Sequence, residues 1–67
     1  MRIRLRYWRD QRGYSVRELA HRAGVGYVSI VRIENDHMSP TVVMLGKLAV
    51  ALQVHITDLF PPPRRRR

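Results

Sequence analysis

The sequence predicts an all-α fold, a compact five-helix domain. Three observations favour it: apolar residues recur at helical spacing, glycines follow short helical segments, and Ser or Thr stands just before two of these segments. With 67 residues and no cysteine, the chain has room for one domain and no disulfide. We divide it into a folded domain, 1–60, and a Pro/Arg-rich basic tail, 61–67, which its composition predicts to be disordered.

Residues 1–12 allow two interpretations. The apolar residues alternate with arginines as far as Tyr7, which fits a half-buried strand. Helical spacing instead places four residues on one stripe: Met1, Leu5, Trp8 and Arg12. We favour the helix, because no turn residue interrupts the segment before Gly13, which is a natural helix C-cap.

A second helix is predicted over 16–23. Ser15 can cap it, and Glu18, three residues on, can reach back to the N–H of the cap. Its inner face would consist of Leu19, Ala20 and Ala23. Gly24 ends it, because the residue after a helix commonly needs a left-handed backbone.

Three further helices complete the domain. One spans 26–34 or 27–34, and the next runs from a Thr41 cap to Leu52. The second of these carries an apolar stripe at i, i+3, i+4 and i+7: Leu45, Leu48, Ala49 and Leu52. A short fifth helix, 56–60, stops at three consecutive prolines, which cannot continue a helix.

The third helix has too many apolar residues for one inward face. Ile30 and Ile33, with Val25 just before the helix, lie on one side and would face the core. The other side carries a mixed set: Tyr27, Val28, Val31, Arg32 and Asn35. This second face is therefore available for a partner.

The charge points to a polyanion as that partner. Thirteen Lys and Arg against five Asp and Glu give +8, and four of the cations form the terminal run 64–67. All but one of the basic residues are Arg, which suits bidentate contacts to phosphates and base edges. A basic surface that only keeps the chain soluble, or a genome rich in Arg codons, explains the charge equally well.

The sequence has no motif typical of an enzyme, a metal site or a nucleotide-binding loop. The histidines at 21, 37 and 55 are too far apart for a metal-site motif, the serines have no nearby His/Asp arrangement, and no glycine-rich phosphate loop is present. We therefore expect no enzyme, no cofactor and no small-molecule ligand. No apolar run approaches the length of a membrane span, so we expect no membrane partner and a cytoplasmic location.

The order of several weak motifs resembles the helix-turn-helix family of phage lambda repressor and Cro, also called the xenobiotic-response-element family. The matching segments are "LRYWRDQRGYS", "ELAHRAGV", "IVRIEN", "SPT", "LGKLAVAL" and "ITDLF". They cover nearly all of residues 1–60. The resemblance implies a DNA-binding domain whose third helix, here 26–35, enters the major groove of double-stranded DNA.

Individual roles follow from matching positions. Tyr27, Val28 and Arg32 match base-facing positions, whereas Ser29 and Asn35 match frequent phosphate contacts. Val16 stands where the family commonly has a Gln that contacts phosphate or base, and Gly26 where Ser or Thr usually caps the third helix. Neither can supply the usual hydrogen bond.

Side-chain chemistry predicts two further contacts: Val31, like Val28, with a thymine methyl group, and Arg17 with a phosphate. Arg9 and Glu34 match positions that form a structural ion pair in the family.

We therefore expect a sequence-specific transcriptional regulator, a dimeric repressor that reads a palindromic operator. Ile56 and Phe60 are the first candidates for the homodimer contact, with Ile3 and Tyr7 as the second. The alternative is an antitoxin or another protein-interaction subunit in which DNA binding is secondary. In that case the apolar outer face of the third helix would bind protein.

Overall fold

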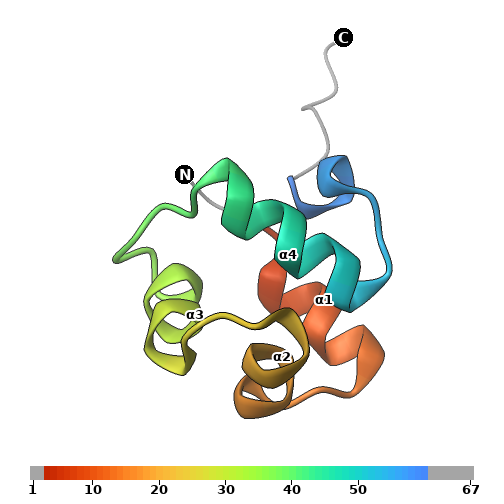
Figure 1. The fold of residues 1–67 in the computed structure, drawn as a ribbon, viewed down its shortest axis with the longest axis horizontal. Helices are drawn as coiled ribbons and strands as arrows, with labels where there is room; N and C mark the ends of the chain where they lie inside the picture. The colour runs from red at the N-terminus through yellow and green to blue at the C-terminus, as the bar shows by residue number, and fades with distance from the viewer. Residues whose placement is uncertain (1–2, 61–67) are drawn as a thin grey trace, which may run out of the picture.

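The computed structural model describes residues 3–60, and within them the chain is helical, without strands. In chain order the helices are α1 (Leu5–Arg12), α2 (Val16–Ala23), α3 (Tyr27–Glu34), α4 (Val42–Leu52) and the 3-10 helix η1 (Ile56–Leu59) (Figure 1). The predicted all-α class is confirmed. The predicted place of Met1 on a helical stripe and the predicted disorder of 61–67 lie outside the described residues.

Helix α1 begins at Leu5, so the prediction of one helix through 1–12 is right only for its second part. Ile3 and Arg4 precede the helix. The backbone N–H of Arg4 donates a hydrogen bond of 2.6 Å to the carbonyl of Leu59, and Ile3 packs against the core. This hydrogen bond to a distant segment holds Ile3 and Arg4 outside the helix. No pattern in the neighbouring sequence predicts the bond.

The inner side of α1 is joined to the end of the domain. The indole N–H of Trp8 donates to the carbonyl of Asp58 at 2.8 Å, and Nε of Arg12 donates to the carbonyl of Leu52 at 2.7 Å. Both bonds satisfy carbonyls at or near helix ends, where no intrahelical donor is available. Gly13 ends α1 with φ of 71°, as predicted.

Helix α2 begins and ends as the sequence predicts. The hydroxyl of Ser15 accepts a hydrogen bond of 3.0 Å from the backbone N–H of Glu18, and Gly24 ends the helix with φ of 68°. The expected return bond is replaced by another: the Glu18 carboxylate accepts from Nε of Arg22 at 2.6 Å, one turn along the helix.

Helix α4 also follows its prediction. The hydroxyl of Thr41 accepts from the backbone N–H of Met44 at 3.1 Å, and the predicted apolar stripe is buried. The helix ends at Gln53, which has φ of 60° although it is not a glycine. The left-handed backbone costs a residue with a Cβ more than it costs glycine.

The predicted fifth α-helix, 56–60, is instead the 3-10 helix η1. The N–H of Asp58 donates to the carbonyl of His55 and that of Phe60 to the carbonyl of Thr57, which is the i to i+3 pattern of a 3-10 helix. The segment is only four residues long and precedes a proline, so it cannot build several turns of α-helix. The described chain thus has four α-helices, not five.

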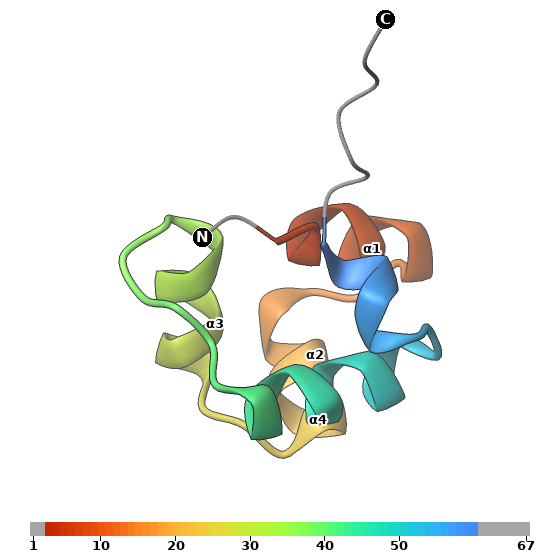
Figure 2. The ribbon, with the colours of Figure 1, turned by 90° about the horizontal axis from the view of Figure 1, so that it is seen from above.

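One hydrophobic core holds these elements together. Helix α4 packs against α2, α1 and η1, while α3 packs against α2 (Figure 2). The buried side chains come from all five elements: Leu5, Leu19, Ala20, Ala23, Ile30, Ile33, Leu45, Leu48, Ala49, Leu52 and Leu59. None of the helices within residues 3–60 has the length and apolar character that crossing a membrane requires.

Candidate nucleic-acid interface

Helices α2 and α3 are joined by a short turn that fixes the orientation of α3. The backbone N–H groups of Gly24 and Val25 both donate to the carbonyl of Ala20, at 2.9 and 3.1 Å. On α3 itself, Ile30 and Ile33 are 0% and 5% exposed. These two anchors, one turn of helix apart, commit one side of α3 to the core and leave its other side in solvent.

The outer side of α3 presents apolar and polar groups together. Tyr27 and Val28 keep 43% and 56% of their surface exposed, and Arg32 and Asn35 are exposed on the following turns. Arg32 takes part in no ion pair within residues 3–60, so its guanidinium is free for a ligand. Val31, which stands one turn after Tyr27 and one turn before Asn35, is half-buried.

The first turn of α3 and the start of α2 carry the remaining predicted contacts. Gly26 is exposed and supplies no side-chain cap, while Ser29 is half-buried. Val16 is also half-buried, and its side chain packs against the core, so only part of it faces outward.

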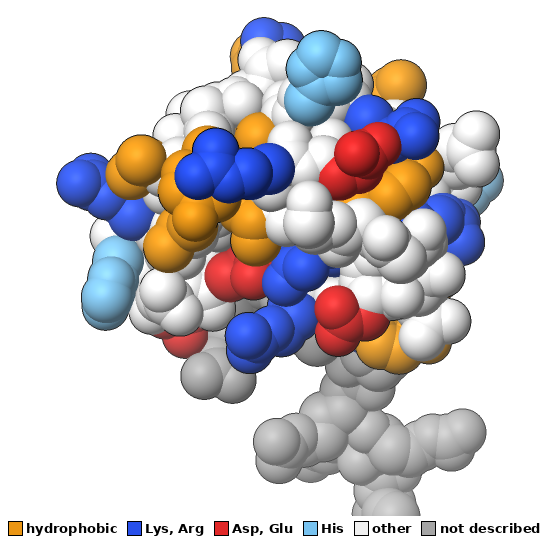
Figure 3. Space-filling view, turned by 90° about the horizontal axis from the view of Figure 1, so that it is seen from below, with side chains coloured by type: hydrophobic (Ala, Val, Ile, Leu, Met, Phe, Trp, Pro, Cys, Tyr) orange, Lys and Arg blue, Asp and Glu red, His pale blue; other side chains and the backbone are white. Residues whose placement is uncertain are grey.

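Arg17 links the two helices of this surface. Its guanidinium carbon lies 4.7 Å from the centre of the Tyr27 ring, a cation–π contact between α2 and α3. Both residues are predicted DNA contacts, but the contact between them could not be predicted from the sequence, because it forms only where the turn brings the two helices together. Figure 3 shows hydrophobic and cationic side chains gathered on the side of the molecule where α3 lies.

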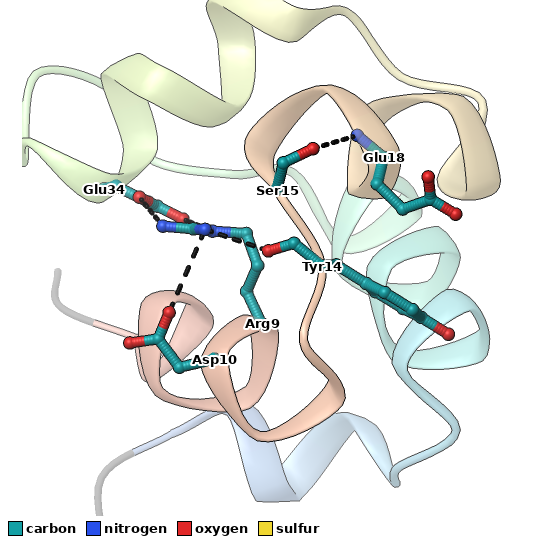
Figure 4. A network of polar contacts seen from close by, with 6 residues as sticks. All are labelled: Arg9, Asp10, Tyr14, Ser15, Glu18 and Glu34. Atoms are coloured by element: carbon teal, nitrogen blue, oxygen red, sulfur yellow. Dashed lines mark hydrogen bonds and ion pairs between the residues drawn. The ribbon is translucent and has the colours of Figure 1, made fainter.

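A largely buried ion pair between Arg9 and Glu34 supports α3 from the side of α1 (Figure 4). Nε and Nη2 of Arg9 donate to the two carboxylate oxygens of Glu34 at 2.8 and 3.1 Å, and Nη1 donates to the carbonyl of Tyr14 at 3.0 Å. The two side chains are 12% and 8% exposed. The hydrogen bond to Glu34 raises the pKa of Arg9 although partial burial lowers it. Residues named together from the sequence thus meet in the structure, joining α1 to the end of α3.

The residues expected at a homodimer contact are less prominent. Ile56 and Phe60 are half-buried and pack against the core. Ile3 precedes α1 and so shares no helix face with Tyr7, which is 44% exposed.

The most exposed valines lie elsewhere, on α4, and were not among the predicted site residues. Val42, Val43 and Val50 are 77%, 69% and 78% exposed. Helical spacing does signal the exposure of Val43 and Val50, which lie off the stripe of buried residues on the same helix, whereas Val42 precedes Leu45 and Ala49 on that stripe and is exposed at the first turn.

Comparisons with known proteins agree with this architecture. A model of the helix-turn-helix family HTH_3 matches residues 5–59. The HTH-type transcriptional regulator SutR of Escherichia coli (strain K12) is 38% identical over 60 residues, which cover 90% of this chain but only 34% of SutR.

Two solved structures are similar over most of both chains. The N-terminal DNA-binding domain of SinR from Bacillus subtilis has a TM-score of 0.84 at 30% identity, covering 92% of this chain and 91% of that one. The restriction-modification controller protein C.AhdI from Aeromonas hydrophila has a TM-score of 0.82 at 32% identity, covering 85% and 86%. The fold, the turn between α2 and α3 and the family match lead to one conclusion: this chain belongs to the HTH_3 helix-turn-helix family.

Proposed function

We propose that the chain is a sequence-specific regulator of transcription that binds double-stranded DNA with α3 in the major groove. The observation that carries the proposal is the two-sided character of α3. Ile30 and Ile33 fix its inner side, while Tyr27, Val28 and Arg32 stand together on the exposed surface. The relatives support it, because SutR is named a transcriptional regulator and the similar part of SinR a DNA-binding domain.

Base recognition is assigned to the exposed side chains in the middle of α3. The unpaired guanidinium of Arg32 fits O6 and N7 of a guanine, which accept two parallel hydrogen bonds. Val28 is the more exposed valine and suits a thymine methyl group, with Val31 contributing the smaller surface that it keeps. Two kinds of base pair would thus be read by neighbouring turns.

Contacts to the sugar-phosphate backbone are assigned to the flanks of the same surface. Arg17 lies against the Tyr27 ring, which limits its freedom while its N–H donors stay available to a phosphate. Ser29, Asn35 and the exposed backbone at Gly26 supply further donors on α3. We assign no hydrogen bond to Val16, because its side chain is apolar and half-buried.

We further propose a cytoplasmic homodimer that binds a palindromic operator and represses transcription by covering a promoter. Two copies read half-sites about one helical turn, roughly 34 Å, apart, which multiplies the selectivity of a single short helix. The exposed portions of Ile56 and Phe60 are proposed as the contact between copies. No step of this function needs a cofactor.

Selection from random DNA duplexes at physiological salt tests the proposal. We expect enrichment of a palindromic sequence, with half-sites whose spacing matches one helical turn. Uniform, salt-sensitive binding to all duplexes would instead favour the alternative, an antitoxin or interaction subunit with secondary DNA binding.

A matched pair of arginine variants makes the selection sharper. Arg32→Ala alters the exposed side of α3, whereas Arg6→Ala removes an exposed arginine of α1. The enriched sequence should change with the first variant and stay the same with the second. An identical enriched sequence for both variants and the parent chain would contradict base reading by Arg32.

A further inference from the structure

Helix α4 carries an apolar face that neither the core nor the proposed DNA surface uses. Val42, Val43 and Val50 are all more exposed than Val28, the most exposed apolar residue of α3. Helix α4 forms one edge of the molecule in Figure 2, with α2 beside it. Contiguous exposed apolar surface of this kind is characteristic of interaction sites.

This face is hollowed into a groove between α4 and the end of α2. The three valines share it with four other residues: Arg22, Ala23, Gly46 and Lys47. Gly46 stands midway along the exposed stripe, and a Cβ added there would meet no atom within 4 Å. A side chain at this position would therefore extend into open space beside the valines.

The charges around the groove indicate the charge that its binding partner should carry. Among residues 3–60, the charged side chains that line it are two cations, Arg22 and Lys47, and no acidic side chain of this range lines it. Arg22 is already paired with Glu18, but Lys47 takes part in no ion pair within residues 3–60. A second copy docked by the same face would oppose cations with cations, which disfavours it. An acidic partner would neutralise Lys47.

The length of the face indicates the shape of that partner. Val42 and Val50 are eight residues apart on α4, which corresponds to about 12 Å along the helix axis. Apolar side chains at i, i+4 and i+7 of a partner helix span a similar distance. An amphipathic helix commonly binds by placing such side chains in a hydrophobic groove. We propose that the groove between α2 and α4 binds an acidic amphipathic helix of a protein partner, with apolar anchors over Gly46 and carboxylates beside Lys47.

A designed peptide provides the test. The probe is an amphipathic helix of about five turns, roughly 18 residues, with leucines on one face and glutamates beside them. Its control has lysines in place of the glutamates. Amide chemical shifts of the isotopically labelled chain are recorded at physiological salt. We expect the glutamate peptide to shift residues 22–23 and 42–50, and the lysine peptide to leave them unchanged.

Three sets of substitutions in the groove test separately the roles of its charge, its apolar surface and the open space at Gly46. Lys47→Glu should reverse the preference between the two peptides. Val43→Gln combined with Val50→Gln should lower the affinity for the glutamate peptide about tenfold, because apolar burial is lost. The matched control Val28→Gln on α3 should leave this affinity unchanged. Gly46→Ala should raise the melting temperature, because alanine favours the helix over glycine. The same substitution should lower the affinity for the glutamate peptide, because the added methyl group occupies space in the groove.

Several outcomes would overturn the proposal. They are equal binding of both peptides, shifts centred on α3, or no shift at saturating peptide. Shifts of 42–50 that depend on protein concentration without any peptide would assign the face to a second copy instead. DNA binding by α3 is measured separately, so failure here would leave the proposed function standing.

Discussion

At the scale of single residues, Glu34 connects stability to function, because it ends the helix proposed to read DNA. Its carboxylate is nearly buried and is paired with Arg9 through two hydrogen bonds. Removing Glu34 leaves the Arg9 guanidinium, in a site of low solvent access, with only the more distant and exposed carboxylate of Asp10, at 3.9 Å. We therefore expect Glu34→Ala to lower the free energy of unfolding by about 3 kcal/mol, measured by urea denaturation.

The exposed pair on α2 is the control for Glu34. Glu18 and Arg22 are 44% and 49% exposed, so solvent already screens their attraction. Glu18→Ala should cost less than about 1 kcal/mol. Equal losses for Glu34→Ala and Glu18→Ala would mean that burial adds nothing to the Arg9 pair.

A second residue, Arg32, should affect binding and not stability. It is exposed and forms no ion pair within residues 3–60, so its truncation removes no internal contact of that kind. If it reads a guanine, Arg32→Ala should weaken specific DNA binding by about 1–3 kcal/mol and relax the preference at one base pair in each half-site. Fluorescence anisotropy with the selected operator and its point variants measures both effects. An equal loss on every sequence would make Arg32 a phosphate contact.

At the scale of elements, the predictions succeeded where the signals are local. Ser15 and Thr41 cap α2 and α4, and Gly24 ends α2, because a cap needs only its neighbours in the chain. The start of α1 could not be predicted, since Arg4 bonds to Leu59, some fifty residues away. Long-range contacts of this kind have no signature in a short window of sequence.

The candidate site divides in the same way. Helical periodicity separated Ile30 and Ile33 from Val28, because both sides belong to one helix. Helical periodicity could not predict the cation–π contact of Arg17 with Tyr27, because that contact depends on how α2 and α3 pack against each other. The exposure of Val43 and Val50 on α4 could have been predicted, since both lie on the side of the helix opposite its buried stripe.

The end of α4 gives a prediction about an element. Gln53 has φ of 60°, and its carbonyl accepts a hydrogen bond from Arg12 at 3.4 Å. Gln53→Gly keeps this backbone bond and removes the steric penalty of a Cβ in the left-handed region. We expect a gain of up to about 1 kcal/mol, part of it offset by the greater freedom of glycine in the unfolded chain.

Thermal unfolding of two variants checks the gain at Gln53. Gln53→Ala keeps a Cβ in the left-handed backbone and should not raise the melting temperature. Stabilisation by alanine as large as that by glycine would show that the backbone conformation at this position carries no penalty.

At the scale of the whole molecule, one small core serves two separate surfaces. The anchors of α3 and the stripe of α4 both belong to it, yet the exposed sides of these helices differ in chemistry. The outer face of α3 has an unpaired arginine among its apolar residues, whereas the α4 groove is mainly valine with cations at its rim. The DNA surface proposed on α3 and the helix-binding groove proposed on α4 therefore use different side chains of the domain.

The distribution of charge gives a prediction for the entire chain. Four of its thirteen basic residues form the terminal run 64–67, beyond the helices proposed to bind DNA. If these arginines contact phosphates, each contact releases counterions, and the slope of log K against log salt concentration steepens by about 0.9 per phosphate. Deleting 64–67 should therefore flatten that slope and leave the selected sequence unchanged, because phosphate contacts carry no base information. Titrations of the selected operator over a range of salt concentrations, with and without 64–67, measure the difference. An unchanged slope would reduce the run to a solubilising tail, and an altered operator would mean that these arginines reach base edges in the minor groove.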